Sequence, residues 1–389
     1  MVQEDSVFRE ERQKTGWREL VAAGLYQTGA LRALEGLSRS YELRRDAKRS
    51  VLPRWRRVST AKFAILCYHR IGTGGIPLYS SLPPEVFEAQ MRFLRKRYEI
   101  VSLTELCERL ADPGAKGQAV AVTFDDGYRD LYTQALPVLR AYQVPATIYL
   151  TVGAIETGQV SWYDRVFLAL QVCPGDTLHL ELDKPCRFEL PSPAARFRAA
   201  LEIVGSMRRL PDERRRECCA ALERHIPLPP EEMVDRMLTW DQIQTMQRAG
   251  LAFGSHSLTH PVLSRVAPAR MESELRKSKQ VLEERIGQPV KDFAYPFGQR
   301  ADCGALAGEP FARLGYRSAA TTIWGINRGG ANPYALRRVQ IGEERSLSMF
   351  AFRLNQLLLE ADDEAHRPEP AESPSEKDEG RCHRRGLVQ

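Results

Sequence analysis

The chain has 389 residues, of which 43% are hydrophobic and 27% are charged. These proportions exclude collagen-like, coiled-coil and wholly disordered chains, and the length suits one large α/β domain with appendages or two average domains. Lys and Arg exceed Asp and Glu by 56 to 50, and this net charge of +6 is too small an excess to indicate nucleic-acid binding by itself.

The sequence shows neither an export signal nor a membrane span. Residues 1–16 carry charges of both signs without an apolar stretch, and no later run approaches the roughly 18 consecutive apolar residues that a spanning helix needs. The eight cysteines include no C-x-x-C pair, which favours free thiols in a reducing compartment. We therefore expect a cytoplasmic protein, or one bound peripherally at the inner face of the membrane.

The two ends of the chain differ in character from its middle. Residues 1–58 are predicted to contain a helix from Trp17 followed by a basic connector that includes Trp55. This segment suits peripheral contact with an anionic membrane, or a helix packed on the main domain with a solvated linker. Residues 361–389 are rich in Pro, Glu, Ser and Arg and are predicted to be a disordered tail.

Residues 59–360 alternate short apolar runs with helical patterns and are predicted to form the main domain. The predicted strands are Ala61–Tyr68, Ala119–Phe124, Pro145–Thr151, Leu251–Gly254, Val290–Tyr295, Tyr316–Thr321 and Leu336–Ile341. Helices are predicted after Pro84, over Leu131–Tyr142 and from Met271 to a C-cap at Gly287. This alternation predicts a mostly parallel sheet covered by helices, either open or closed into a barrel.

Residues 153–240 interrupt the alternation and are predicted to be a largely helical insertion. Ser161–Leu170 has a helical pattern, and Arg208–Arg216 is a charged run. The sequence Thr239-Trp-Asp-Gln242 has the spacing of a capping box and should begin the next helix.

Two clusters of reactive side chains follow predicted strands. Asp125 and Asp126, in the sequence TFDDG, leave a buried strand side by side, and a nearby cation would relieve their repulsion. Asp-Gly is also an ordinary turn pair. His256 and His260, in the sequence HSLTH, follow another strand, and on one helical turn both imidazoles would face the same ion.

The carboxyl ends of parallel strands lie on one face of a sheet, so the two clusters should meet there. Two imidazoles and one carboxylate leave positions open on an ion for water and substrate, and the spare carboxylate can take the proton of the water. This is the equipment of metal-assisted hydrolysis. The same ligand set also suits a non-haem iron oxygenase.

Three segments in this order resemble motifs of the polysaccharide deacetylases, the NodB-homology enzymes or carbohydrate esterase family 4. They are TFDDG at Thr123–Gly127, HSLTH at His256–His260 and FAYPFG at Phe293–Gly298. The resemblance covers roughly Lys62 to Ile341. It implies a distorted (β/α) barrel that removes N-acetyl groups from the amino sugars of a polysaccharide.

The resemblance also implies roles for individual residues. Asp126, His256 and His260 match the family's metal ligands, which suit zinc, with cobalt or nickel as substitutes, and Asp125 matches its general base. The backbone N–H that stabilises the oxyanion falls near Phe297. Tyr295 and Phe297 are aromatic candidates for substrate contact, although Tyr295 also suits a place in the core.

The sequence departs from the family pattern at two positions. Ala294 stands where an arginine usually orients the base, and either Arg337 or Arg338 from the last strand can replace it; we favour Arg338. No Leu-x-His motif follows that strand, but the Tyr-His-Arg segment at His69 resembles the poly-N-acetylglucosamine deacetylase branch, which implies that His69 is the general acid.

Two further alternatives remain open from the sequence. The alanine at position 294 allows a carbohydrate-binding pseudoenzyme, and the lack of an export signal allows a hydrolase that acts on a lipid-linked or small amino sugar.

Overall fold

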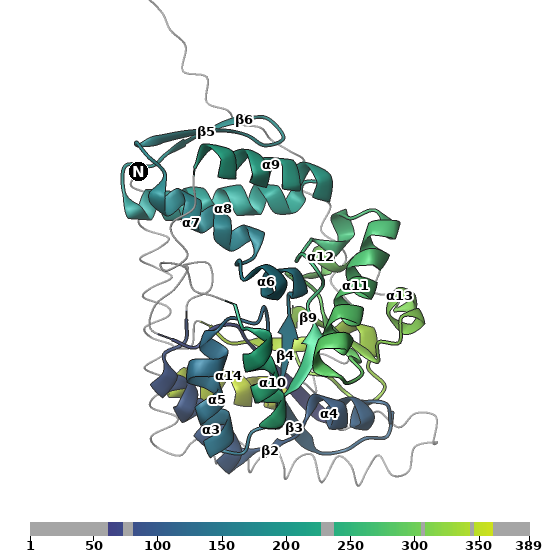
Figure 1. Cartoon of the computed structure of the whole chain (residues 1–389). Helices are drawn as coiled ribbons and strands as arrows, with labels where there is room; N and C mark the ends of the chain where they lie inside the picture. The colour runs from purple at the N-terminus through teal and green to yellow at the C-terminus, as the bar shows by residue number, and fades with distance from the viewer. Residues whose placement is uncertain (1–60, 73–80, 227–236, 305–307, 343–345, 361–389) are drawn as a thin grey trace, which may run out of the picture.

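A computed structural model describes residues 61–72, 81–226, 237–304, 308–342 and 346–360 (Figure 1). For residues 359 and 360 the description covers the backbone alone. The predicted N-terminal helix and basic connector, with their membrane contact, and the predicted tail lie outside the described residues. Among the described helices, none has the length and apolar character needed to cross a membrane.

The described strands form one large parallel sheet and one hairpin. Their bounds are β1 (Lys62–Tyr68), β2 (Glu99–Ile100), β3 (Gln118–Phe124), β4 (Ala146–Leu150), β5 (Thr177–Glu181), β6 (Pro185–Glu189), β7 (Ala252–Ser255), β8 (Asp292–Ala294), β9 (Ser318–Trp324) and β10 (Leu336–Gln340). The strands predicted from the sequence are all present, several with shifted ends.

The parallel sheet closes into a barrel, as the predicted fold class requires. Seven of the described strands follow one another in the order β1, β10, β9, β8, β7, β4 and β3, and β3 then pairs with β1 to close the ring. The closing ladder is continuous from Lys62↔Gln118 to Tyr68↔Phe124. The short strand β2 pairs with β3 beside this ring.

The helices surround the barrel or belong to the insertion (Figure 1). Their bounds are α3 (Pro84–Arg97), α4 (Leu103–Leu110), α5 (Leu136–Ala141), α6 (Val152–Thr157), α7 (Trp162–Val172), α8 (Pro193–Arg209), α9 (Asp212–His225), α10 (Trp240–Arg248), α11 (Pro268–Ile286), α12 (Arg300–Cys303), α13 (Glu309–Arg313) and α14 (Leu347–Glu360). A π-helical turn, Leu131–Ala135, leads into α5, and 3₁₀ turns cover Leu263–Arg265 and Pro333–Ala335.

Local sequence signals explain where several helices begin and end. The predicted capping box opens α10, with Thr239 and Gln242 each accepting from the backbone of the other. The predicted C-cap Gly287 ends α11 in the left-handed region. A β-carbon disfavours that region, which explains why glycine stands there.

Alternation along the barrel strands decides which side chains reach the inside. Phe63 and Ile65 of β1 and Ala121 of β3 belong to a core cluster with Leu336 and Ala320, whereas their neighbours Ala64 and Leu66 pack in the other, larger cluster. Because successive residues of a strand point to opposite faces, Cys67, Thr123 and Arg338 continue the inner series toward the carboxyl end of the barrel. That end is where the candidate site lies.

The predicted insertion contains a β-hairpin as well as helices. Strands β5 and β6 pair antiparallel, with Leu178 and Phe188 facing each other across the hairpin. Figure 1 shows this hairpin together with α7, α8 and α9, stacked beyond α6 at one end of the barrel. Within the described part of the segment, the predicted helical content is therefore joined by two strands. The boundaries at residues 153 and 240 remain a prediction.

Candidate functional site

The paired carboxylates leave β3 at the mouth of the barrel through a sharp turn. Asp125 continues the ladder, because its N–H donates to the carbonyl of Tyr68 at 2.9 Å. Asp126 and Gly127 then adopt left-handed φ angles of 70° and 87°. A β-carbon on residue 127 would lie 2.6 Å from a side-chain carbon of Leu150, so only glycine lets the chain turn here.

The two histidines follow β7 in a loop, and the helical turn that we predicted for them is wrong. Residues 256–260 lack helical structure, and Ser257 and His260 have left-handed φ angles of 66° and 55°. Hydroxyl groups hold this backbone: Ser255 Oγ accepts from Ser257 N at 3.2 Å, and Ser257 Oγ accepts from His260 N at 3.0 Å. Serine side chains compete in this way with regular secondary structure. The loop nevertheless brings both imidazoles to one place.

Asp126, His256 and His260 form a compact, buried group. Oδ1 of Asp126 lies 3.7 Å from Nε2 of His256 and 3.4 Å from Nε2 of His260. One ligand atom from each residue lies within 4.8 Å of the others, as a shared metal ion would require. Nδ1 of His256 lies 2.8 Å from the carbonyl oxygen of Ala294, and since a carbonyl can only accept, Nδ1 carries the proton. Nε2 of His256 therefore turns a lone pair toward Asp126.

The Asp126 carboxylate is poorly compensated by the protein alone. It is 1% exposed, and neither of its oxygens accepts a hydrogen bond from the described residues. Burial raises its pKa well above the ordinary range, the charges of Asp125 and Asp164 raise it further, and the nearby Tyr163 hydroxyl and the Arg338 charge offset only part of this. Burial also lowers the pKa of His256 and, more strongly, that of His260, so both imidazoles are neutral as metal ligands must be. The donor set thus fits a divalent cation.

Asp125, by contrast, is fully paired. Arg338 donates from Nη1 to Oδ1 and from Nη2 to Oδ2 of Asp125, both at 2.7 Å, with both side chains buried. Burial alone would raise the pKa of Asp125, but the charge of Arg338 overrides it and holds the pKa well below the ordinary value. Arg337 is exposed and lies on the other face of β10. Of the two arginines considered from the sequence, Arg338 is the one that contacts Asp125, while Ala294 lies buried in the barrel.

His69 and Cys67 approach Asp125 from the end of β1. Nε2 of His69 lies 4.0 Å from Oδ2 of Asp125, and the thiol of Cys67 donates to the same oxygen at 3.5 Å. Burial lowers the pKa of His69 to about 4, against the opposing charge of Asp125. The imidazole is therefore neutral at pH 7. Cys67 was not among the predicted site residues, although alternation along β1 points it to the same face as Phe63 and Ile65.

Comparison with known proteins settles the family. The sequence profile of the family described as polysaccharide deacetylase matches residues 112–317, just over half of the chain. The chain belongs to this family. YxkH of Bacillus subtilis strain 168, which its name groups with the polysaccharide deacetylases, is 24% identical over 292 residues that cover 75% of each chain. The poly-β-1,6-N-acetyl-D-glucosamine N-deacetylase of Escherichia coli K12 is 36% identical over 90 residues, 22% of this chain and 12% of that protein.

Two solved structures share the fold of this deacetylase family member. The Streptococcus pyogenes deacetylase PplD, in complex with acetate, aligns with a TM-score of 0.51 and 20% identity over 76% of this chain and 97% of its own. IcaB from Ammonifex degensii aligns with a TM-score of 0.50 and 19% identity over 78% and 99%. At this identity the likeness concerns the fold, and it confirms the predicted barrel.

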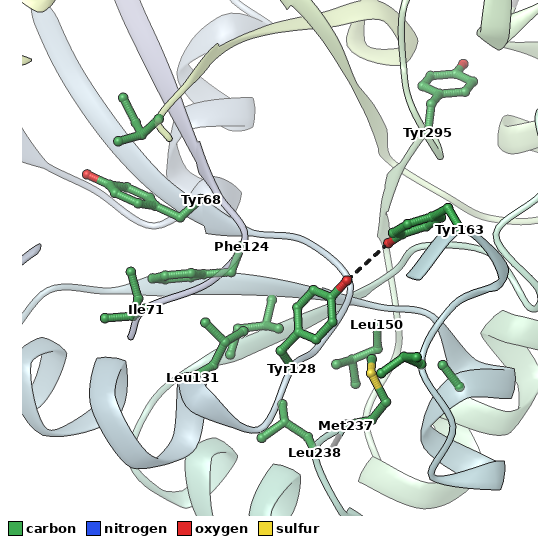
Figure 2. Packing of buried hydrophobic residues seen from close by; sticks show 14 of the residues in the cluster. Tyr68, Ile71, Phe124, Tyr128, Leu131, Leu150, Tyr163, Met237, Leu238 and Tyr295 are labelled. Atoms are coloured by element: carbon green, nitrogen blue, oxygen red, sulfur yellow. Dashed lines mark hydrogen bonds between the residues drawn. The ribbon is translucent and has the colours of Figure 1, made fainter. Parts of the chain in front are cut away.

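The segment Phe293–Gly298 brings Phe297 beside His260 and buries Tyr295 in the core. The ring of Phe297 lies 4.9 Å from the ring of His260. The backbone of Phe297 has a left-handed φ of 59°, and its backbone N–H donates to no acceptor among the described residues. Tyr295 is 1% exposed, donates to the carbonyl of Tyr334 and packs against Phe293. Figure 2 shows its ring pointing away from Tyr163. The substrate contact expected for Tyr295 does not fit this position, because its ring is buried against Phe293 and Phe311 and its hydroxyl already donates to Tyr334.

Residues of the insertion and of α11 complete the site, and sequence patterns did not single them out as partners of the histidines. Trp162 and Tyr163 contact the His260 end of the loop. Glu274, fully buried on α11, accepts from the N–H groups of Leu258 and Thr259 at 2.9 and 2.8 Å. These contacts join segments distant in sequence, so no local periodicity could have revealed them.

Proposed function

We propose that the protein is a metal-dependent hydrolase that removes N-acetyl groups from N-acetylated amino sugars of a polysaccharide and releases acetate. The observation that carries this proposal is the contrast between two adjacent carboxylates. Asp125 is ionised and held by Arg338, whereas Asp126 faces two neutral imidazoles and has no cationic partner among the described residues. One carboxylate is thus arranged as a base and the other as a ligand.

Asp126, His256 and His260 would hold the cation, and two imidazoles with one carboxylate suit zinc, with cobalt or nickel as substitutes. When bound there, such a cation would polarise the acetamide carbonyl and lower the pKa of a nearby water toward neutrality.

Asp125 would take the proton from the attacking water. The bidentate contact with Arg338 fixes the plane of the carboxylate and keeps it ionised at any working pH. The hydroxyl of the water forms the new bond to the acetyl carbon, and the bond between that carbon and the sugar nitrogen breaks. Acetate and a free amine result, and the amine must receive a proton as it leaves.

His69 would deliver that proton. It is neutral at rest, so it must first receive the proton that Asp125 has taken, and Nε2 of His69 lies 4.0 Å from Oδ2 of Asp125. The low pKa of Asp125 favours passing the proton on, and an imidazolium with a pKa of about 4 is acidic enough to protonate an amine. The free N–H of Phe297 would stabilise the developing oxyanion, which is usually a large catalytic contribution.

The substrate class is proposed from the family and from one named relative. The E. coli protein is named for poly-β-1,6-N-acetyl-D-glucosamine, but the match covers 12% of its length. We infer an N-acetylated polymer of glucosamine as the first substrate to test. A small or lipid-linked amino sugar would use the same three side chains and stays as the alternative.

Acetate release tests the proposal directly. The purified protein should release acetate from β-1,6-linked or β-1,4-linked N-acetylglucosamine oligosaccharides, lose the activity to a chelator and regain it with Zn²⁺, Co²⁺ or Ni²⁺. D125N should lower kcat by about 10²–10⁴-fold while the cation stays bound, as removal of a general base predicts. Full activity in D125N would remove Asp125 from the base role.

The rival functions give different results in the same experiment. Oligosaccharide binding without acetate release under all three cations would indicate a carbohydrate-binding pseudoenzyme. Oxygen uptake that depends on Fe²⁺ would indicate an oxygenase. Arg338 weakens the case for a pseudoenzyme, since the case rested on the missing arginine at Ala294 and Asp125 has an arginine partner after all.

A further inference from the structure

The two histidines of the candidate metal site are held in different ways. The ring of His256 is oriented by its own hydrogen bond, from Nδ1 to the carbonyl of Ala294 at 2.8 Å. Nδ1 of His260 is buried and has no partner among the described residues. A metal-binding imidazole normally donates its second ring N–H to a neighbour that fixes its orientation. For His260, some other contact must do this.

The first turn of α7 supplies contacts to His260 from the insertion. The indole N–H of Trp162 donates to the backbone carbonyl of His260 at 3.0 Å, in a buried bond between residues 98 positions apart. The next residue, Tyr163, places its ring 4.9 Å from the imidazole. Phe297 lies at the same distance from the imidazole and 5.8 Å from Tyr163, so two aromatic rings that touch each other pack together against the imidazole. His260 itself has a left-handed φ of 55°, a conformation that its surroundings must hold in place.

Trp162 is itself held in place by Arg215 of the insertion. The guanidinium of Arg215, on α9, lies 4.7 Å from the centre of the indole and is 3% exposed. Asp212 accepts from Nε of Arg215 at 3.2 Å, which holds the guanidinium over the ring. The next residue, Tyr163, contacts the barrel: its hydroxyl lies 3.4 Å from the hydroxyl of Tyr128, as Figure 2 shows. The first turn of α7 therefore contacts both α9 of the insertion, through Arg215, and the turn that follows β3, through Tyr128.

We propose that Trp162 is a positioning residue that sets His260 for cation binding, so that the helical insertion contributes to the affinity of the metal site. This inference rests on the proposed function, because it requires His260 to be a ligand. Loss of the indole N–H would free the His260 carbonyl and let the strained residue relax. The imidazole would then lose its preset direction, although its ligand atom would remain.

The test compares two Trp→Phe variants. W162F removes the bond to His260, whereas W240F removes an equivalent bond in which the indole N–H of Trp240 donates to Glu156 at 2.7 Å on the surface. Metal-free wild type and both variants are titrated with Co²⁺, followed by visible absorption, and with Zn²⁺ in competition with a chromophoric chelator. We expect W162F to bind about tenfold more weakly with an altered Co²⁺ spectrum, and W240F to match the wild type within about twofold.

The outcomes separate this inference from the proposed function. A W162F protein that binds Co²⁺ as tightly as the wild type overturns the positioning role, and so does an equal loss in W240F. A wild type that binds no Co²⁺, or binds it equally well as H260A, overturns the proposed function as well. If W162F does not fold, R215K serves instead, because it loosens the support of an intact Trp162. Its affinity should fall by a smaller factor, and unchanged affinity would refute the proposal.

Discussion

The two sides of the candidate site treat adjacent carboxylates in opposite ways. On the side of Asp125, the protein supplies a bidentate arginine and a thiol, and the carboxylate has little need of anything else. On the side of Asp126, the protein supplies two neutral imidazoles and the nearby Tyr163 hydroxyl, and the described residues give this carboxylate no cationic partner. Burial is nearly equal for the two, so the difference lies in their partners alone. The Asp125 side is complete as a protein structure, whereas the proposed function assigns a cation to the Asp126 side.

The largest expected effect follows from changing Asp126. D126N should abolish cation binding and activity, yet it should make the metal-free protein more stable at neutral pH. The pKa of Asp126 is raised above its unfolded value of about 3.9, so the ionised carboxylate destabilises the fold increasingly as pH rises above that value. Thermal unfolding in a chelator should show a higher Tm for D126N at pH 7, and the difference should vanish as pH falls to about 4.

Asp292 provides the matched control. It is also a buried carboxylate, but Arg317 and the Ser318 hydroxyl donate to it at 2.6 and 2.7 Å. D292N should therefore destabilise the metal-free protein, by about 1–3 kcal/mol. Added Co²⁺ should raise the Tm of the wild type and of D292N but leave D126N unchanged. A D126N protein that is less stable than the wild type in chelator would mean that Asp126 is better compensated than its contacts indicate.

A smaller effect is expected on the Asp125 side. R338M would leave Asp125 buried without its partner, which should raise the pKa of Asp125 and cost roughly 3–5 kcal/mol of stability. Because the carboxylate also loses the contact that fixes its plane, kcat should fall by about 10²-fold or more. R337M changes the neighbouring, exposed arginine and should alter stability by less than about 0.5 kcal/mol. Steady-state kinetics and urea unfolding of the pair decide the point. Equal losses in both variants would show that the Arg338 contact has no special part.

The same contrast separates what the sequence could predict from what it could not. Asp125, Asp126, His256 and His260 were predicted because each pair lies within one short motif after one strand. The inward direction of Arg338 depends on knowing that Leu336 faces the barrel interior, which only closure of β1 onto β3 decides. Before the family resemblance entered, the alternating pattern suited an open sheet equally well.

Residues that act across the fold left no local signal. Glu274 and Trp162 reach the histidine loop over 15 or more positions of chain, and their residue types are ordinary for helices. The hairpin of β5 and β6 was missed inside a segment of helical composition, although Leu178 and Leu180 alternate with exposed residues. The helical turn predicted for the histidine loop failed because serine hydroxyls bond the backbone there.

The smallest expected effect concerns the pH dependence of stability that His69 causes on the Asp125 side. Burial lowers the pKa of His69 to about 4, so the unfolded chain takes up a proton near pH 6.5 before the folded protein does. The stability contributed by neutral His69 is complete above pH 6.5 and is lost as pH falls toward 4. The loss should reach at most about 3 kcal/mol, the equivalent of the pKa difference.

H69Q should lack this part of the pH dependence, while H225Q, which changes an exposed histidine of α9, should keep it. Urea unfolding of the three proteins in chelator between pH 7 and pH 4 measures the difference. Burial also lowers the pKa of His256 and of His260, so both add to the pH dependence. Only the difference between wild type and H69Q therefore reports on His69. Parallel curves for wild type and H69Q would mean that solvent reaches His69 freely. The Asp125 side would then be as open to water as a surface site, and proton transfer from Asp125 to His69 would have to pass through that water.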